Sequence, residues 1–259
     1  MGLFSQMKAA AGVGASEVQI AVEKGRYHWA DTLRGKIILS GGEIEQVASE
    51  VTVNITETWL ESRRTHDGKT RQERMHRTYS ERLVASQLAI AVGVSHEFEF
   101  ELQVPNEGAL AHDWYVAARI SVPKAADRHG RADFQLLPSR AVMGLVNAVC
   151  HVVPCELKSL SNRSTQVTVD LKPAANHSKD LDGLMLIVHA GGDPIVGAFE
   201  INPQEKSFKD RIKALAQQDR VKHQISFPAA PLAAAAEDAT KVPPEIVEQF
   251  KGFIAPHLS

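Results

Sequence analysis

The sequence predicts a mainly β protein with two antiparallel β-sandwich domains and a few short helices. In the first half of the chain, apolar and polar residues alternate with a period of two, which is typical of half-buried strands. The clearest run covers residues 98–104, where four apolar side chains alternate with polar ones. Turn signals such as Gly41-Gly42 and Pro105-Asn106 separate these runs at the spacing expected of antiparallel sandwiches. The sequence shows no alternation of strands with helices, which is the pattern that would predict a parallel sheet.

A change of pattern near Pro138 divides the predicted chain into three parts. Residues 1–134 are predicted as the first sandwich and residues 135–227 as a second, smaller β domain with helices. Residues 228–259 are predicted as an Ala/Pro-rich linker and a C-terminal amphipathic helix. A chain of 259 residues can supply one large core or two modest ones, so the strand spacing decides in favour of two domains.

A charged hairpin is predicted to project from the first domain. Asp67-Gly68 is a candidate type I′ turn, and its flanking arms, 58–66 and 69–80, are polar. Two polar arms cannot both lie in a core, so we expect a ribbon that leaves the sheet. Its candidate partner- or anion-binding residues are Arg63, Arg64, Lys69, Arg71 and Arg74. Arginine binds phosphate and carboxylate through paired hydrogen bonds. The sequence alone favours the simpler alternative, a solvated hairpin whose charges discourage aggregation.

Two helices are predicted in the second half before the linker. Apolar residues recur at helical spacing after Pro138, which predicts a short connecting helix. Residues 207–210 have the pattern of a capping box, which predicts the start of another helix after the strand-like runs at 167–171, 184–189 and 195–201.

The last predicted helix begins at Pro243-Pro244 and has an apolar stripe along one side. Its candidate docking residues are Ile246, Phe250 and Phe253. An isolated helix of about twelve residues is marginal in water, so the stripe must find an apolar groove. We expect that groove on this protein itself, because a free stripe would expose an aggregation-prone patch.

Charge and cysteine content predict a cytoplasmic protein without a nucleic-acid partner. The formal net charge is −2, which gives no global attraction to polyanions. We interpret Cys150 and Cys155 as small core residues in a reducing compartment, since two cysteines are too few for a disulfide framework. No segment approaches the roughly 20 apolar residues that span a bilayer, and residues 1–16 lack the pattern of a signal peptide.

Motifs of catalysis and of cofactor binding fail at their defining positions. Residues 93–97 approach a nucleophile elbow, but Glu97 stands where the second glycine is needed. Residues 12–14 lack the third glycine of a dinucleotide-binding loop. The cysteines and His151 offer metal ligands, yet no second ligand pair follows at zinc-finger spacing. The sequence therefore predicts no enzyme activity, no cofactor and no metal ion.

The opening of the chain carries a series of residues that suggests a family: Val13 to Val18, then Tyr27, then Leu33 to Gly42, and Gln46. Together with the strands at 98–105 and 114–122, this series resembles the bacterial sporulation-control (SpoOM-like) family of arrestin-like proteins. The resemblance implies a short N-terminal helix, an arrestin-like sandwich and a second β domain, up to about residue 227. It also implies a regulatory adaptor without chemistry of its own, whose protein partners are reached through exposed edges and loops.

The hypothesis at this stage is an arrestin-like adaptor or scaffold that binds acidic or phosphorylated protein partners, with homo-oligomerisation left open. One alternative is an enzyme whose site is assembled from dispersed residues, which a deep pocket with convergent polar groups would favour. The other is a peripheral membrane module in which Leu3, Phe4 and Met7, with the terminal helix, make a weak contact with lipid.

Overall fold

The computed structural model describes residues 16–64, 66–123, 125–204 and 220–258, which fall into two compact units. Unit 1 comprises residues 1–105 and 112–136, and unit 2 comprises residues 106–111 and 137–259. The predicted mainly β fold is confirmed, since strands dominate both units. The predicted N-terminal helix and the helix predicted to start at residue 207 lie outside the described residues.

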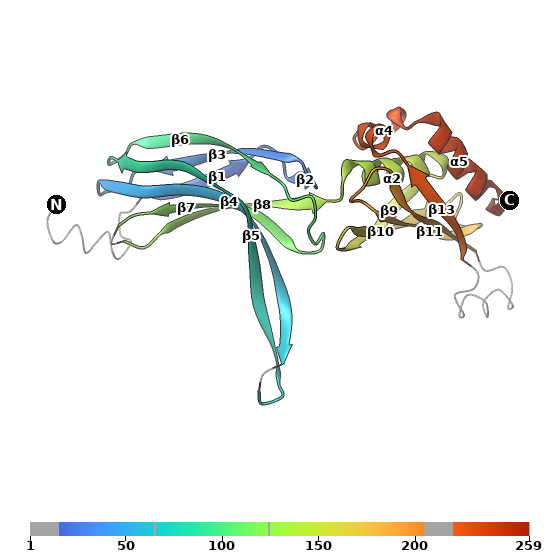
Figure 1. Cartoon of the computed structure of the whole chain (residues 1–259), viewed down its shortest axis with the longest axis horizontal. Coiled ribbons are helices and arrows are strands. Elements are labelled where there is room, and N and C mark those ends of the chain that lie inside the picture. Colours follow the sequence, from blue (N-terminus) through green and yellow to red (C-terminus); the bar gives the residue numbers. More distant parts are fainter. Residues whose placement is uncertain (1–15, 65, 124, 205–219, 259) are drawn as a thin grey trace. The chain divides into compact units, whose positions relative to one another are not determined.

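Unit 1 is a sandwich of two antiparallel sheets (Figure 1). The smaller sheet has the order β1-β3-β6, with β1 at Glu17–Val22, β3 at Thr32–Ser40 and β6 at Ser95–Gln103. The larger sheet has the order β2-β8-β7-β4-β5. Its strands are β2 (Arg26–His28), β8 (Arg128–Leu137), β7 (Asp113–Ser121), β4 (Gln46–Arg64) and β5 (Thr70–Ile90). Both β4 and β5 are much longer than their neighbours, and their paired ends extend beyond the sandwich (Figure 1).

The core of unit 1 follows the predicted alternation. Phe100 is 2% exposed, as its place among glutamates predicted, and it pairs with Gly35 on β3. A Cβ atom at Gly35 would lie 2.5 Å from the ring of Phe100, so the ring occupies the space that this glycine leaves. The glutamates of β6 face outward and form ion pairs with Arg34 and Lys36 of β3, for example Arg34 with Glu101 at 2.6 Å.

Unit 2 differs from the expectation of a second sandwich, because its described residues form a single antiparallel sheet. The strand order is β13-β12-β11-β10-β9. The bounds are Cys155–Arg163 for β9, Gln166–Pro173 for β10, Leu181–His189 for β11, Ile195–Pro203 for β12 and Val221–Phe227 for β13. One face of this sheet is covered by helices in place of a second sheet (Figure 1). The apolar stripes of those helices bury the same kind of strand face that a facing sheet would bury.

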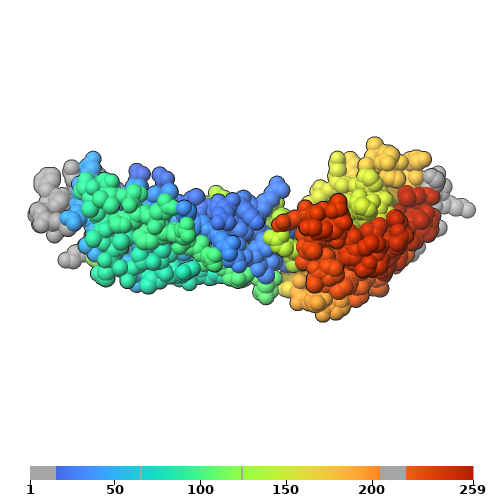
Figure 2. Space-filling model, turned by 90° about the horizontal axis from the view of Figure 1, so that it is seen from above, coloured from blue at the N-terminus to red at the C-terminus, as the bar shows by residue number. Residues whose placement is uncertain are grey.

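Among the described residues of unit 2, the second layer is formed by the helices α2 (Arg140–Val152), α4 (Ala229–Ala234) and α5 (Pro244–Ile254), with short 3-10 turns at Ala239–Lys241 and Ala255–His257. The C-terminal residues, red in Figure 2, cover a continuous part of the helical face of unit 2. The connecting helix predicted after Pro138 is α2.

The linker predicted over residues 228–241 is instead packed. Leu232 of α4 is fully buried, and the carbonyl oxygen of Leu232 lies only 2.0 Å from the position that a Cβ atom on Gly144 of α2 would occupy. The side chain of Asn147 donates hydrogen bonds to the carbonyl oxygens of Ala235 and Ala236, at 2.7 and 3.0 Å. Small residues such as Gly144 permit this close approach of two helices.

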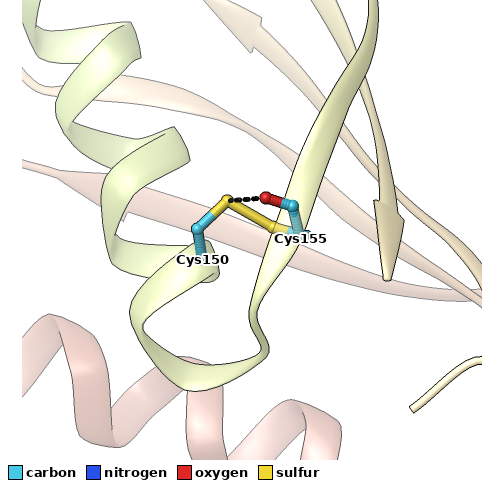
Figure 3. Close-up of a disulfide and its surroundings, with 2 residues drawn as sticks. All are labelled: Cys150 and Cys155. Atoms are coloured by element: carbon cyan, nitrogen blue, oxygen red, sulfur yellow. Dashed lines mark hydrogen bonds between the residues drawn. A yellow bond between two sulfur atoms is a disulfide. The ribbon is translucent and has the colours of Figure 1, made fainter. Parts of the chain in front are cut away.

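The two cysteines also depart from the prediction. Cys150, at the end of α2, and Cys155, at the start of β9, form a disulfide (Figure 3). The turn between helix and strand brings their Cα atoms to 5.2 Å, within the usual range for a disulfide. The pair therefore gives no argument for a reducing compartment.

Candidate functional site

The most prominent exposed feature of unit 1 is the extension of β4 and β5, which we call the ribbon and define as residues 58–64 and 70–76. Thr58 pairs with His76 at its root and Arg64 with Thr70 at its tip. Residues 66–69 lie outside the strands, so the turn is longer than the predicted two-residue type I′ turn at Asp67-Gly68. Of that dipeptide, Gly68 has a positive φ of 81°.

A β-bulge interrupts the pairing of β4 with β5 inside the sandwich, before the ribbon begins. Val53 pairs with Arg82 and Ile55 with Tyr79, so one residue of β4 faces two residues of β5. Ser80 in this bulge has a φ of 47°, and its hydroxyl donates a 2.7 Å hydrogen bond to the carbonyl oxygen of Gln103 on β6. A bulge increases the local twist and bends the strand that carries it, so this one affects the course of β5 before the ribbon begins.

On one face of the ribbon, which we call the Trp59 face, the positive and negative side chains balance each other. In this register it carries Trp59, Glu61, Arg63, Arg71, Glu73 and Met75. The guanidinium of Arg63 lies 3.5 Å from Glu61 and 3.4 Å from Glu73, where Glu73 is on the opposite strand. Arg63 and Arg71, both predicted to bind anions, therefore share a face with two carboxylates.

The opposite face, which we call the Leu60 face, has a different charge balance. It carries Thr58, Leu60, Ser62, Arg64, Thr70, Gln72, Arg74 and His76, and none of these is acidic. Leu60 is 63% exposed and is paired in register with Arg74. In the described part of the chain, no ion pair joins Arg64 or Arg74 to a carboxylate. The nearest acidic residue by register is Asp113, which pairs with Thr58 at the root.

The five predicted anion-binding residues thus do not converge on one surface. Arg64 and Arg74 lie on the Leu60 face, while Arg63 and Arg71 lie on the Trp59 face. Lys69 belongs to the connecting loop and forms an ion pair with Asp67 at 3.5 Å.

A buried polar cluster lies at the root of the ribbon, on the side of the Trp59 face. Glu57 is only 3% exposed, and its carboxylate accepts a 2.8 Å hydrogen bond from the hydroxyl of Tyr79. His112 Nδ1 lies 2.8 Å from the other oxygen of Glu57, and the imidazole stacks on Trp59 with ring centroids 5.1 Å apart. A carboxylate this deeply buried requires such partners, because desolvation of an unpaired charge is costly.

Two further contacts complete the root cluster. The guanidinium of Arg77 lies about 6 Å from the ring centroids of both Trp59 and Tyr79 and hydrogen-bonds the Tyr79 hydroxyl at 3.2 Å. Burial, with a smaller contribution from Glu57, raises the pKa of Tyr79 above its ordinary value. The cluster therefore fixes the first residues of the ribbon through polar and aromatic contacts together.

A metal centre and a concave site are the other kinds of functional site that the described residues could form. No group of three or more His, Cys, Asp or Glu side chains within that part is arranged to hold a metal ion. An open depression of about 140 Å³ on the unit 2 sheet is lined by Asp170, Asp182 and Glu200, among others. Glu200 is paired there with Arg220 and Lys222, at 3.5 and 3.2 Å.

The predicted docking helix is used inside unit 2. Ile246 is 2% exposed and Phe250 is fully buried, where its ring packs edge-on against Phe199 of β12 with centroids 5.1 Å apart. Phe253 is half-buried and stacks on His223 at 4.2 Å. Burial, together with the nearby His257, lowers the pKa of His223. The groove that this helix needs is thus formed by the sheet and helices of its own unit.

Comparison with protein families identifies the chain. The model of the family described as SpoOM protein matches residues 4–183, which is well over half of the sequence. The chain belongs to the SpoOM family. The resemblance deduced from the opening strands is thereby confirmed. Among curated proteins, no match is found.

Solved structures extend the likeness of this SpoOM-family chain at the level of fold. The crystal structure of Spo0M, the sporulation control protein of Bacillus subtilis, matches with a TM-score of 0.54 and 16% identity, covering 92% of this chain and all of that one. Two weaker matches are AvmM, which catalyses macrocyclisation in alchivemycin A biosynthesis, and the alkylpurine DNA glycosylase AlkC of Pseudomonas fluorescens. Their TM-scores are 0.32 and 0.27, their identities 7% and 11%, and they cover 48% and 52% of this chain. The matches span 89% of the AvmM chain and 35% of the AlkC chain.

Sequence reasoning missed the root cluster of this SpoOM-family chain entirely. Glu57 and Tyr79 are 22 residues apart and His112 is 55 residues from Glu57, so only the strand pairing brings the three together. One signal was available: Glu57 interrupts the inward-facing series Val51, Val53, Ile55 with a carboxylate.

Proposed function

We propose that this SpoOM-family chain is a non-enzymatic regulatory adaptor that uses the ribbon to contact an acidic or phosphorylated protein partner. The observation that carries the proposal is the ribbon itself: a hairpin that extends beyond the sandwich and keeps both faces exposed. A polar hairpin that contributes no side chains to the core beyond its root adds little to folding stability. Contact with another molecule would give this exposed hairpin a role that folding does not give it.

The root cluster supports this role. An arm that presents a surface must be held at its base, and Glu57, Tyr79 and His112 provide that support through hydrogen bonds of 2.8 Å. Buried polar networks of this kind add specificity and rigidity when every member is satisfied. The bulge at Ser80 is tied to Gln103 of β6 by a 2.7 Å hydrogen bond, which adds a further point of attachment before the arm begins.

The alternative roles receive less support from the described residues. The apolar stripe of α5, which a membrane module would use, is buried in unit 2. Leu3, Phe4 and Met7, the other residues of that alternative, lie outside the described residues. No helix in the described part of the chain is long and apolar enough to cross a bilayer. For the enzyme alternative, the carboxylate of Glu57 could orient the imidazole of His112 as in a catalytic pair. Both residues, however, hold the root of the ribbon.

The proposal includes a cytoplasmic location, in which the disulfide between Cys150 and Cys155 would be an exception to the usual reduced state of cytosolic thiols. Cell fractionation combined with alkylation of free thiols before lysis tests both points. Recovery of the protein only from an extracytoplasmic fraction would contradict this part of the proposal.

A ribbonless variant tests the adaptor role directly. Residues 59–75 are replaced by Asn-Gly, which closes a two-residue hairpin between the paired residues Thr58 and His76. Partners are captured from native cells with the wild-type protein, identified, purified and titrated against both forms. We expect the purified partner to bind the wild type and to lose at least about tenfold in affinity for the ribbonless variant. Equal affinities for the two folded proteins would reject the proposal.

A further inference from the structure

The two faces of the ribbon have different charge balance, and this difference narrows the kind of partner that fits. On the Trp59 face, two arginines share the surface with two glutamates, and Arg63 contacts both carboxylates. The Leu60 face presents Arg64 and Arg74 with no acidic residue among its eight members. Since the Leu60 face carries cations and no carboxylate of its own, an anionic partner gains more by binding there.

The Leu60 face also has an apolar anchor. Leu60 is 63% exposed and lies in register opposite Arg74, so one rung of the ribbon offers an apolar and a cationic group together. Arg64 lies four residues further along β4, on the order of 13 Å away at the rise of a strand. An extended peptide has the same rise, so acidic residues four positions apart on a partner match the two arginines.

We propose that the Leu60 face binds an extended acidic segment of a protein partner, with one apolar side chain against Leu60 and carboxylates or phosphates on Arg64 and Arg74. This inference rests on the adaptor function proposed above and adds the face and the chemistry of the segment. A lone leucine on a narrow strip favours a peptide over a lipid surface, because membrane binding by a peripheral element needs a broad apolar face.

Two double variants with the same change of charge test the inference. R64S/R74S removes the cations of the Leu60 face, and R63S/R71S removes the same number from the Trp59 face. The probe is a fluorescent peptide with two glutamates four positions apart and a leucine two positions before the first glutamate, so that all three side chains point to one side of the extended peptide. Its anisotropy is titrated with the full chain at low and at physiological salt. Thermal melts confirm that each variant is folded.

We expect R64S/R74S to weaken peptide binding by at least about tenfold and R63S/R71S by less than about threefold, since charge-assisted hydrogen bonds are strong only where the partner's acids meet the guanidinium groups. L60S should also weaken binding, by about threefold to tenfold. A peptide with its glutamates placed two positions apart should bind more weakly than the matched one.

Three outcomes would overturn the inference. Equal loss in the two double variants would show attraction to the overall charge of the ribbon and no preference for a face. Binding to vesicles of anionic lipid without saturable binding of the peptide would identify a membrane as the ligand. In the third outcome, the protein does not bind the peptide, but its purified partner still requires the ribbon for binding. This would reject the acidic segment and leave the adaptor function intact.

Discussion

The ribbon and the C-terminal helix α5 are both amphipathic segments that sequence reasoning marked as contact elements, yet the fold treats them in opposite ways. The helix buries Ile246 and Phe250 against its own unit, whereas the ribbon leaves Leu60 63% exposed. The reason is the size of the apolar surface. Burial contributes about 25 cal/mol per Å², so a stripe with a phenylalanine and two isoleucines docks on the nearest apolar face, while one leucine among arginines cannot offset the desolvation of its neighbours.

The contrast shows that an amphipathic segment can serve either the fold or a partner. A segment that can be satisfied within the chain becomes part of the core and loses its availability to partners. A segment whose charges forbid burial stays outside and remains available. The comparison predicts that mutations in α5 change stability and that mutations in the ribbon change binding.

The largest effect is expected at Phe250. Phe250→Ala should lower the free energy of unfolding by about 3–5 kcal/mol, because it opens a cavity against Phe199 and Phe227. Urea denaturation measures the loss. Phe253→Ala is the matched control, since Phe253 is only half-buried and should cost clearly less. A loss below about 1 kcal/mol at Phe250 would show that α5 is loosely attached and resembles the ribbon after all.

The disulfide is expected to contribute less. Replacing Cys150 and Cys155 together by serine should cost roughly 2 kcal/mol, because the bond closes a short loop of sequence separation 5. Denaturation of the wild type with and without a reductant should show the same difference, and the double variant should not respond to the reductant. A wild type that is equally stable in both conditions would show that the bond adds nothing to unit 2.

The root of the ribbon gives a pH-dependent effect. Burial raises the pKa of Tyr79 in the folded protein, so the fold favours the neutral phenol. This contribution is fully present below the ordinary tyrosine pKa near 10 and is lost as the pH rises through the raised pKa. Tyr79→Phe should therefore reduce the alkaline loss of stability.

The same substitution should cost about 1 kcal/mol at neutral pH, through the lost hydrogen bond to Glu57. Thermal melts across the alkaline range measure both effects. Tyr115→Phe is the control, because the Tyr115 ring lies at another place in the same sheet, under Arg131. Identical pH profiles for wild type and Tyr79→Phe would contradict the assigned cause.

The smallest effect on stability is expected from the ribbon variants. L60S, R64S/R74S and R63S/R71S should each change the free energy of unfolding by less than about 0.5 kcal/mol, since exposed side chains and surface ion pairs contribute little. Chemical denaturation checks this. A destabilisation above about 1 kcal/mol would mean that the ribbon packs against the fold, and the contrast with α5 would fail.

Much of the strand architecture was predictable from local pattern. The alternation at 98–104 placed Phe100 in the core, and the apolar recurrence after Pro138 located α2. These predictions succeed because the side-chain period of a strand or helix is a local property. The packing of residues 228–241 was not predictable in this way. Its decisive feature is the contact between Gly144 and Leu232, which are 88 residues apart and have no local signature.

The sequence by itself determined the mainly β class, the SpoOM family and the polar hairpin, because each depends on residues that are near one another along the chain. Only the tertiary structure decided that unit 2 pairs one sheet with helices and that Cys150 meets Cys155. Strand register likewise sorted the ribbon cations onto two faces and brought Glu57, Tyr79 and His112 together. Register and layer choice depend on contacts between distant segments, and a one-residue shift of β5 against β4 would have exchanged the faces of Arg71 and Arg74.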